Sequence, residues 1–453
     1  MKSIGSIAVV ALYLISSVEA IYGPPPLNKK DVTSVLGVNT HNLNPSTHDL
    51  DLIQEAGIRW VRDDVGWQQV EKVKGEYDFS DVDYMFKSLA ERNIGWICIL
   101  GAYNPNYNNA TDKPLISTQT QIDAWAKFAG AIAAKYSKTN IVLFELTNEP
   151  NGMGGFKGDE GAAIYAKLSI AGAKQIHDNG GTVAVSLSTA LHPVSIIPLS
   201  LTLTQRSSIP CTPQGPAVAN LDYDWLDSIF LNGFLTSVDY LTLHPYRSIT
   251  PETVMLDYDK VSKLVNEYNP PNHKIQITQG ECGYEYHGVA TPNLDHELQG
   301  KFVVRMYLSA IGKQVFPAIW YDWKAGNISD PQQEHDGMVD EELNPLPGWY
   351  GTKILHNILR GTEFINMPMA TVSYPSLPSP QDYAVALKNS THSIIVAWSA
   401  LSYEHNIQLH DANGCWNATD WLGKVKQSIC NKKGENYLNV IVTDAPLYLT
   451  QEQ

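Results

Sequence analysis

The sequence is poor in the features that mark redox, zinc and nucleic-acid-binding proteins. Its 453 residues include five cysteines, none in a CxxC pair, so neither a redox motif nor structural zinc is indicated. Lysine and arginine total 32 against 47 aspartates and glutamates, which gives a formal net charge of -15. No basic run stands out, which argues against nucleic acid as a partner. An acidic surface also favours neutral polymers over polyanions as substrates.

Long apolar segments are scarce as well. The run from Ile7 to Ile15 is too short to cross a bilayer, and no later segment is long and apolar enough for a membrane helix. Because Lys2 precedes this run and Val18-Glu19-Ala20 follows it, residues 1–20 are typical of a signal peptide. We therefore expect a secreted, extracellular protein that has no membrane partner.

Glycosylation signals agree with secretion. Four Asn-x-Ser/Thr triplets predict N-glycosylation in a eukaryotic host, at Asn109, Asn327, Asn389 and Asn417.

The cysteines suggest one covalent link. Cys415 and Cys430 are close enough in sequence to form a local disulfide. Cys98 lies in an apolar run and is expected to be a buried thiol. The pairing of Cys211 and Cys282 is open.

The main part of the chain, residues 33–360, alternates strand-like and helix-like segments. Eight such repeats predict an α/β fold, a closed (β/α)8 TIM barrel. A doubly wound open sheet is the alternative, but no Gly-rich phosphate loop follows the first strand. The expected strands are 35–39, 58–62, 94–100, 141–148, 182–187, 238–244, 274–280 and 316–322. The expected helices are 46–56, 82–93, 120–136, 159–178, 221–233, 251–267, 295–312 and 348–360.

The pattern changes near residue 361. Helical periodicity stops, and short strands separated by turn residues predict a small antiparallel β-sandwich over 361–453. Residues 21–32 can pack with this domain. The proline- and serine-rich segment 188–222 follows the fifth strand and is expected to be a loop over the functional face.

Two glutamates end buried strands at the expected mouth of the barrel. Glu149 follows the apolar run that begins at Ile141, and Glu281 follows the run that begins at Lys274. Carboxyl ends of barrel strands carry catalytic groups. Strand alternation predicts which residues share a face with each glutamate: Thr147, Glu145 and Leu143 with Glu149, and Gln279, Ile277 and Ile275 with Glu281.

This pair of carboxyls predicts hydrolysis of a glycosidic bond. One carboxyl can act as acid and the other as nucleophile, at a separation of about 5–5.5 Å for retention or about 6.5–9.5 Å for inversion. Acid, nucleophile and water suffice, so no metal or organic cofactor is implied. Glu145 is a rival carboxyl on the same face, but it lies one layer deeper and is expected to be structural.

The motifs around these glutamates resemble a known clan. Thr147-Asn148-Glu149-Pro150 resembles the strand-four signature of the retaining (β/α)8 glycoside hydrolases, which include families 5 and 39. The segments Trp67–Glu71 and Gly75–Ser80, after Val61-Arg62-Asp63-Asp64, look most like family 39. Two places depart from relatives: Gly101-Ala102-Tyr103-Asn104 replaces the family 5 histidine, and Cys282-Gly283-Tyr284 follows the nucleophile.

The resemblance implies roles for individual residues. Glu149 would be the acid/base and Glu281 the nucleophile. The implied substrate-binding residues are Asn148 at the sugar 2-hydroxyl, Arg62, which keeps Glu281 ionised, His244, Tyr246, which donates to the nucleophile, and Trp323 in an aromatic floor. Tyr103, on a front-face loop, is a candidate subsite residue from its position. Structural alternatives stay open: a barrel salt bridge for Arg62, and core packing for His244, Trp323 and Tyr103.

These inferences predict a secreted retaining β-glycosidase with a carbohydrate partner. Long front-face loops favour endo-action on a neutral β-linked polysaccharide, because an aromatic-lined cleft can stack successive sugars. An exo-acting β-xylosidase or β-glucosidase is the alternative. A non-catalytic carbohydrate-binding barrel is the alternative of another class, but it would be expected to lose one carboxyl of the pair.

Overall fold

The computed structural model describes most of the chain. The described residues are 30–138, 142–152, 154–188, 222–286, 293–326, 335–368 and 381–452. The expected signal peptide, Asn327, Cys211 and nearly all of the segment 188–222 lie outside them, so these predictions are not addressed by the structure.

The barrel predicted from the alternating pattern is confirmed. Eight parallel strands close in sequence order, with β1 pairing with both β2 and β8. The strands are β1 (Leu36–Asn39), β2 (Trp60–Val65), β3 (Gly95–Leu100), β4 (Val142–Leu146), β5 (Thr182–Ser188), β6 (Tyr240–His244), β7 (Gln276–Cys282) and β8 (Ala318–Trp320). The helices around them are α2 (Thr47–Glu55), α4 (Ser80–Ala90), α5 (Gln119–Tyr136), α6 (Gly158–Asp178), α7 (Tyr223–Leu231), α8 (Val254–Tyr268), α9 (His296–Lys313) and α10 (Pro347–Leu359).

Polar residues set where several helices begin. Ser46 caps α2 and forms a capping box with Asp49, and Thr118 does the same with Gln121 in α5. The Asp295 side chain accepts from the Leu298 N–H at the start of α9. Each capping side chain accepts a hydrogen bond from a backbone N–H that has no partner within its helix. The capping residue therefore determines where the helix begins.

The lower part of the barrel is filled with side chains. A cluster of Trp60, Ile97, Leu143, Ala184, Tyr240 and Ile319 packs there. Two residues further along three of these strands, the inward positions become polar: Arg62, Glu145 and Thr242. The apolar cluster therefore closes the barrel from below and leaves the chemistry at the carboxyl ends of the strands.

The C-terminal region forms two antiparallel sheets, as the short strands predicted. A six-stranded sheet has the order β14-β13-β16-β11-β10-β9, and a two-stranded sheet pairs β12 with β15. An apolar cluster that includes Ile407, Trp416 and Leu449 packs within this region. The strands are β9 (Glu363–Asn366), β10 (Asp382–Lys388), β11 (His392–Ser399), β12 (His405–His410), β13 (Cys415–Asp420), β14 (Ile429–Cys430), β15 (Tyr437–Val442) and β16 (Leu447–Glu452).

Two local links complete this region. Cys415 and Cys430 form a disulfide that joins β13 to β14. The N–H of Val32 donates to the carbonyl of Thr362 at 2.9 Å, so the start of the described chain lies against the segment before β9. Cys98 and Cys282 are buried free thiols.

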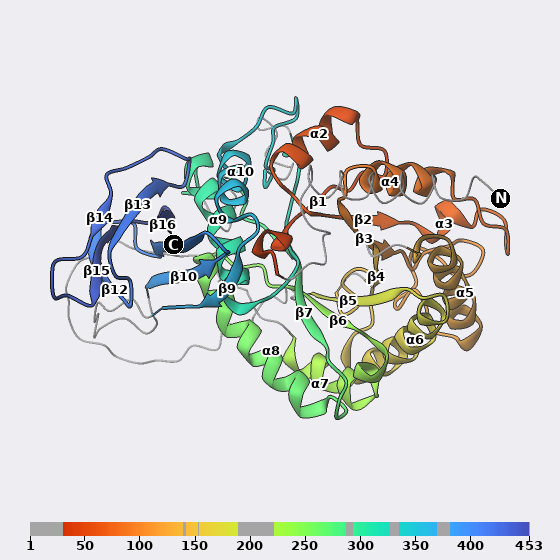
Figure 1. The fold of residues 1–453 in the computed structure, drawn as a ribbon. Helices are drawn as coiled ribbons and strands as arrows, with labels where there is room; N and C mark the ends of the chain where they lie inside the picture. Colours follow the sequence, from red (N-terminus) through yellow and green to blue (C-terminus); the bar gives the residue numbers. More distant parts are fainter. Residues whose placement is uncertain are drawn as a thin grey trace, which may run out of the picture.

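A buried ion pair joins the barrel to the C-terminal domain, which lies beside α9 and α10 (Figure 1). Arg305 of α9 forms two hydrogen bonds to the carboxylate of Glu252, at 2.6 and 2.8 Å. The indole N–H of Trp398 in β11 donates to the same carboxylate at 2.7 Å. Because the Arg305 and Glu252 side chains are at most 1% exposed, the junction is held by a charge pair that water does not screen.

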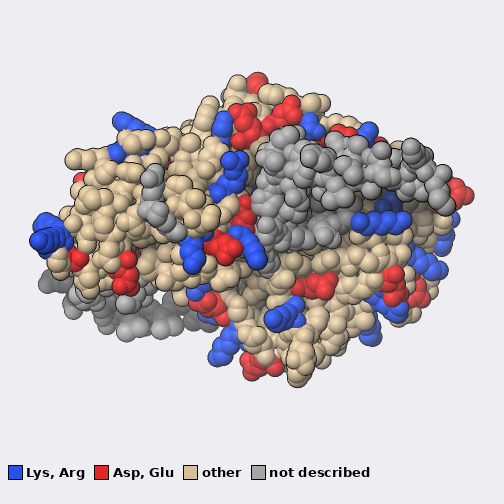
Figure 2. Space-filling model, viewed as in Figure 1, with Lys and Arg blue, Asp and Glu red and all other residues tan. Residues whose placement is uncertain are grey.

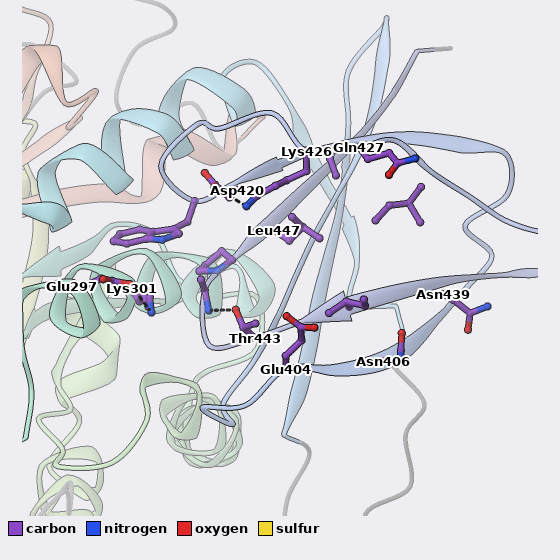
Figure 3. Close-up of a pocket in the computed structure, with 16 residues that line it drawn as sticks. Glu297, Lys301, Glu404, Asn406, Asp420, Lys426, Gln427, Asn439, Thr443 and Leu447 are labelled. Carbon is purple, nitrogen blue, oxygen red and sulfur yellow. Dashed lines mark hydrogen bonds and ion pairs between the residues drawn. The ribbon is translucent and has the colours of Figure 1, made fainter.

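A groove of about 640 Å³ lies at the edge of this junction (Figure 3). Lys301 of α9 contacts Glu297 at 3.0 Å and Asp444 at 3.2 Å, and Lys426 contacts Asp420 at 3.3 Å. Both lysines of the groove therefore already have carboxylate partners.

The surface carries charged side chains of both signs. Acidic and basic side chains are interspersed over the face that Figure 2 shows. Among the described residues, no helix is both long enough and apolar enough to cross a membrane.

We expect Glu252→Ala to destabilise the protein strongly. The change leaves Arg305 buried without its carboxylate, which costs about 3–5 kcal/mol. Asp259→Ala is the control, because Asp259 pairs with Lys313 at 2.7 Å but is 59% exposed. It should cost at most about 1 kcal/mol. Urea unfolding followed by near-ultraviolet circular dichroism measures both, and equal midpoints for the two variants would contradict the expectation.

Candidate active site

Arg62 lies at the centre of the barrel mouth, and all five of its N–H donors are used. Nε and Nη2 bind the two oxygens of Glu145 at 2.9 and 2.6 Å. Nη1 donates to Glu281 at 2.5 Å and to the side-chain oxygen of Asn39 at 3.3 Å, while Nη2 also donates to the side-chain oxygen of Asn148 at 2.8 Å. A guanidinium has five donors in a fixed plane, so this network fixes the positions of four side chains from β1, β4, β7 and the loop after β4.

Glu145 is a structural partner in this network. Its side chain is fully buried, and both of its oxygens are bound by Arg62. Its negative charge therefore balances the positive charge of Arg62. Glu145 lies in the deeper layer that the sequence predicted for it.

Glu281 reaches the site through an irregularity in β7. Thr242 pairs in register with Thr278, and their hydroxyls are 2.8 Å apart inside the barrel. Gln279, the next residue, accepts instead from Tyr258 of α8 at 2.6 Å, so it points outward. The register of β7 then shifts between Gln279 and Cys282.

This shift corrects one expectation. Simple alternation placed Gln279, Ile277 and Ile275 on the face of Glu281. This is wrong, because Gln279 faces the helices and Ile277 and Ile275 pack against the apolar cluster that includes Tyr258. The bulge re-aims Glu281 into the barrel, as bulges next to active sites commonly do.

Glu149 lies beyond the end of its strand. β4 stops at Leu146, and Thr147 and Glu149 have left-handed backbone angles, φ 62° and 42°. A loop therefore carries Glu149, and strand alternation does not decide its direction. His244, at the end of β6, makes a 3.1 Å hydrogen bond from its Nδ1 to Glu149.

His244 lies between the two glutamates. Its Nδ1 is 3.1 Å from Glu149 and 3.5 Å from Glu281. One side-chain atom from each of these three residues lies within 4.8 Å of the others. The two carboxyls therefore approach closely enough, by one oxygen of each, for the separation of about 5–5.5 Å that retaining enzymes use. The same three groups are close enough to ligate a metal ion, but Arg62 and Tyr246 already bind the two oxygens of Glu281.

The surroundings of Glu281 hold it ionised. Burial by itself raises the pKa of this carboxyl, but His244, Arg62 and the hydroxyl of Tyr246, at 2.9 Å, outweigh burial and lower the pKa to about 2. Burial beside Glu281 raises the pKa of Tyr246 well above its usual value, so Tyr246 stays a donor. A charged carboxylate with a fixed donor on each oxygen suits a nucleophile.

One predicted substrate contact lies elsewhere. Trp323 is 2% exposed, and its indole N–H donates to Asp49 of α2 at 3.1 Å, so it is packed in the core as the structural alternative held. Tyr103 is half-buried on the loop after β3, and its role as a subsite residue stays a prediction. Trp67 and Tyr107 stack on each other with ring centres 4.7 Å apart.

Tyr321, two residues before Trp323, is the aromatic residue of this segment that lies beside Tyr246. Its ring stands edge-on to Tyr246, at 6.1 Å between centres, and to His41 at 5.3 Å. His41 Nδ1 lies 3.2 Å from Asp64, and Nε2 lies 2.5 Å from Asn39. His41 and Asp64 follow or end β1 and β2 and remain partly exposed. Their position at the carboxyl ends of barrel strands is the sequence feature that could have identified His41 and Asp64 as residues of the site.

The comparisons with known proteins agree with this geometry. Residues 27–189 match a family model described as cellulase (glycosyl hydrolase family 5). This part contains β1 to β5 and Glu149 and ends before Glu281. No curated protein matches the sequence.

Solved structures share the fold over almost the whole chain. A family 39 glycoside hydrolase from Bacteroides cellulosilyticus WH2 is 17% identical with a TM-score of 0.70, covering 93% of this chain and 81% of that one. A GH30 endoxylanase from Clostridium papyrosolvens C71 is 10% identical with a TM-score of 0.60, covering 94% and 97%. A GH51 arabinofuranosidase from Xanthomonas axonopodis pv. citri is 10% identical with a TM-score of 0.59, covering 94% and 97%. At these identities the likeness shows a common fold.

The family-model match and the paired carboxyls identify the protein as a glycoside hydrolase. The predicted resemblance to the retaining (β/α)8 clan is confirmed.

We expect Tyr246→Phe to move the acidic limb of the pH profile upward. The nucleophile is active when ionised, and its activity is lost as the pH falls through its lowered pKa. Removing a hydrogen bond to a charged group costs about 1.5–3 kcal/mol, or about 1–2 pKa units. The pH dependence of kcat/KM measures the shift. Tyr103→Phe is the control, and an acidic limb that stays where it is in Tyr246→Phe would contradict the assigned hydrogen bond.

Proposed function

We propose that this protein is a secreted endo-acting β-glycosidase that cleaves a neutral polysaccharide with retention. The observation that carries the proposal is the approach of Glu149 and Glu281 within 4.8 Å, with Arg62 bound to Glu281. Neither glutamate is closed off completely, since their side chains are 18% and 6% exposed.

The proposed reaction has two displacements. Glu281 attacks the anomeric carbon while Glu149 gives its proton to the departing oxygen, which leaves a glycosyl ester on Glu281. Glu149, now ionised, takes a proton from water, and the resulting hydroxide displaces Glu281 and releases the sugar. Two inversions at one carbon give net retention. Asn148, fixed by Arg62, is placed to contact the 2-hydroxyl of the sugar beside the cleaved bond.

The charge of the site supports a neutral sugar. Around Arg62 stand Glu145, Glu281 and, beyond them, Glu149, so its positive charge is already balanced. An acidic sugar would meet these carboxylates with no unpaired cation of this cluster to bind it. The described aromatic contacts beside the nucleophile, Tyr246 and Tyr321, suit the apolar face of a sugar ring.

Secretion is part of this proposal. The N-terminal segment has the composition of a signal peptide. Asn109 and Asn417 are exposed and Asn389 is partly exposed, so an oligosaccharide can be attached at each without disturbing the core. The Cys415–Cys430 disulfide suits an oxidising compartment.

We expect Glu149→Ala and Glu281→Ala to lose activity in different ways. An aryl glycoside with a good leaving group needs little help from an acid, so Glu149→Ala should still form the glycosyl-enzyme and then turn over slowly. Azide should speed that second step in Glu149→Ala and have no such effect in Glu281→Ala. Stopped-flow release of the aryl group and mass spectrometry of the covalent species measure the two steps. A Glu149→Ala variant without a slow second step would contradict its role as acid/base.

We expect endo-action to appear in the products of the first minutes. Soluble β-glucan, xylan and mannan are each incubated with the enzyme and with Glu281→Ala as the inactive control. Endo-action on the preferred polymer gives oligosaccharides of several lengths and a fast fall in viscosity. Monosaccharide as the sole early product would replace the endo proposal with exo-action and leave the retaining mechanism in place.

A further inference from the structure

The face of the barrel opposite the active site carries a small cavity rich in basic side chains. The cavity has a volume of about 270 Å³, and Arg59, Arg92, Arg360 and His356 line it. Arg59 immediately precedes β2 and Arg92 lies just before β3, so both are at the N-terminal ends of barrel strands. His356 and Arg360 come from the end of α10. The cavity therefore lies where the last barrel unit meets the first two.

Three carboxylates, those of Glu55, Asp51 and Asp31, lie near four cations in and beside the cavity, those of Arg59, Arg92, Arg360 and Lys353. Glu55 lines it but contacts Lys353 at 2.6 Å, and Asp51 contacts Arg92 at 2.9 Å. Both carboxylates are more than half exposed. The buried Asp31 attracts Arg59. Arg360 forms no ion pair among the described residues, although the whole protein carries a net charge of -15.

Two nitrogen atoms in the cavity wall are buried without a hydrogen-bond partner among the described residues. They are Nε of Arg92 and Nδ1 of His356. Leaving a buried polar nitrogen without a partner destabilises a folded protein, so such groups usually meet water or an ion. Burial, and after it the positive charge of Arg59, lower the pKa of His356 to about 4. The cavity thus disfavours further positive charge.

We propose that this cavity binds one small inorganic oxyanion, phosphate or sulfate, which ties α10 to the segments before β2 and β3. Planar guanidinium groups match the oxygens of such ions, and a neutral imidazole can donate a further hydrogen bond. Ligand pockets for larger molecules begin at about 300 Å³, so a single oxyanion suits this cavity better than an oligosaccharide. The groove in Figure 3 does not offer the same chemistry, since both of its lysines have carboxylate partners.

The bound anion acts on stability and not on turnover. It lies below the apolar cluster that fills the barrel, whereas Glu149 and Glu281 lie above that cluster. Residues at this face of a barrel commonly serve stability. Because the ion binds the folded chain, it should raise the melting temperature with the logarithm of its concentration.

The test compares the full-length wild type with Arg360→Gln and with Lys87→Gln as the matched control. Lys87 is in α4, is 75% exposed and does not line the cavity. Low millimolar inorganic phosphate is added against sodium chloride of equal ionic strength, so that general salt effects are equal. At a phosphate concentration of about ten times Kd, we expect Tm to rise by about 2 °C in the wild type and in Lys87→Gln. The rise should be clearly smaller in Arg360→Gln.

Direct binding supplies the second readout. Titration calorimetry of the wild type with phosphate should show one site per chain, and its affinity should fall at least tenfold in Arg360→Gln. Turnover of an aryl glycoside should be the same in all three proteins. Equal phosphate responses of wild type and Arg360→Gln, or no binding heat in the wild type, would overturn the proposal.

Discussion

The active site depends on the burial of one guanidinium. Arg62 is fully buried, and removing its charge from water is compensated by Glu145, Glu281 and the amide oxygens of Asn39 and Asn148. Each of these acceptors is fixed in turn, because moving any of them would leave a donor of Arg62 without a partner. Glu281, Asn148 beside Glu149, and the structural carboxylate of Glu145 are thus held by the same cation.

Two buried arginines divide the structural work of the chain. Arg62 organises the barrel mouth, and Arg305 joins the barrel to the C-terminal domain through Glu252 and Trp398. The C-terminal domain contacts the helix α9 that covers the last barrel strands, so it supports the side of the barrel that carries β7 and β8. A separate face, below the apolar cluster, holds the basic cavity. The active site, the junction between the domains and the opposite face of the barrel therefore each contain a different group of charged residues.

Glu281 and Glu149 differ in their neighbours at the barrel mouth. Glu281 has an oxygen bound by Arg62 and another bound by Tyr246, so its charged form is favoured. Glu149 is more exposed, and among the described residues its ion pair is with His244 alone. One carboxyl is thereby stabilised as an anion, whereas the other lacks these two donors. Opposite roles for two similar side chains arise from their different neighbours.

The sequence by itself determined the fold class and pointed to Glu149 and Glu281 as the paired carboxyls. Eight strand–helix repeats set the barrel, because apolar runs and capped amphipathic segments depend on local periodicity. The local reading is weaker for short, partly exposed strands such as β9 and β14. It placed Trp323 in the site, whereas the chain turns after β8 so that Trp323 reaches Asp49 and Tyr321 faces Tyr246. It also counted alternation through Gln279, where the register of β7 shifts. The tertiary structure alone decided the direction of these side chains, the five bonds of Arg62 and the distance between the carboxyls, because each depends on contacts between residues far apart in the chain.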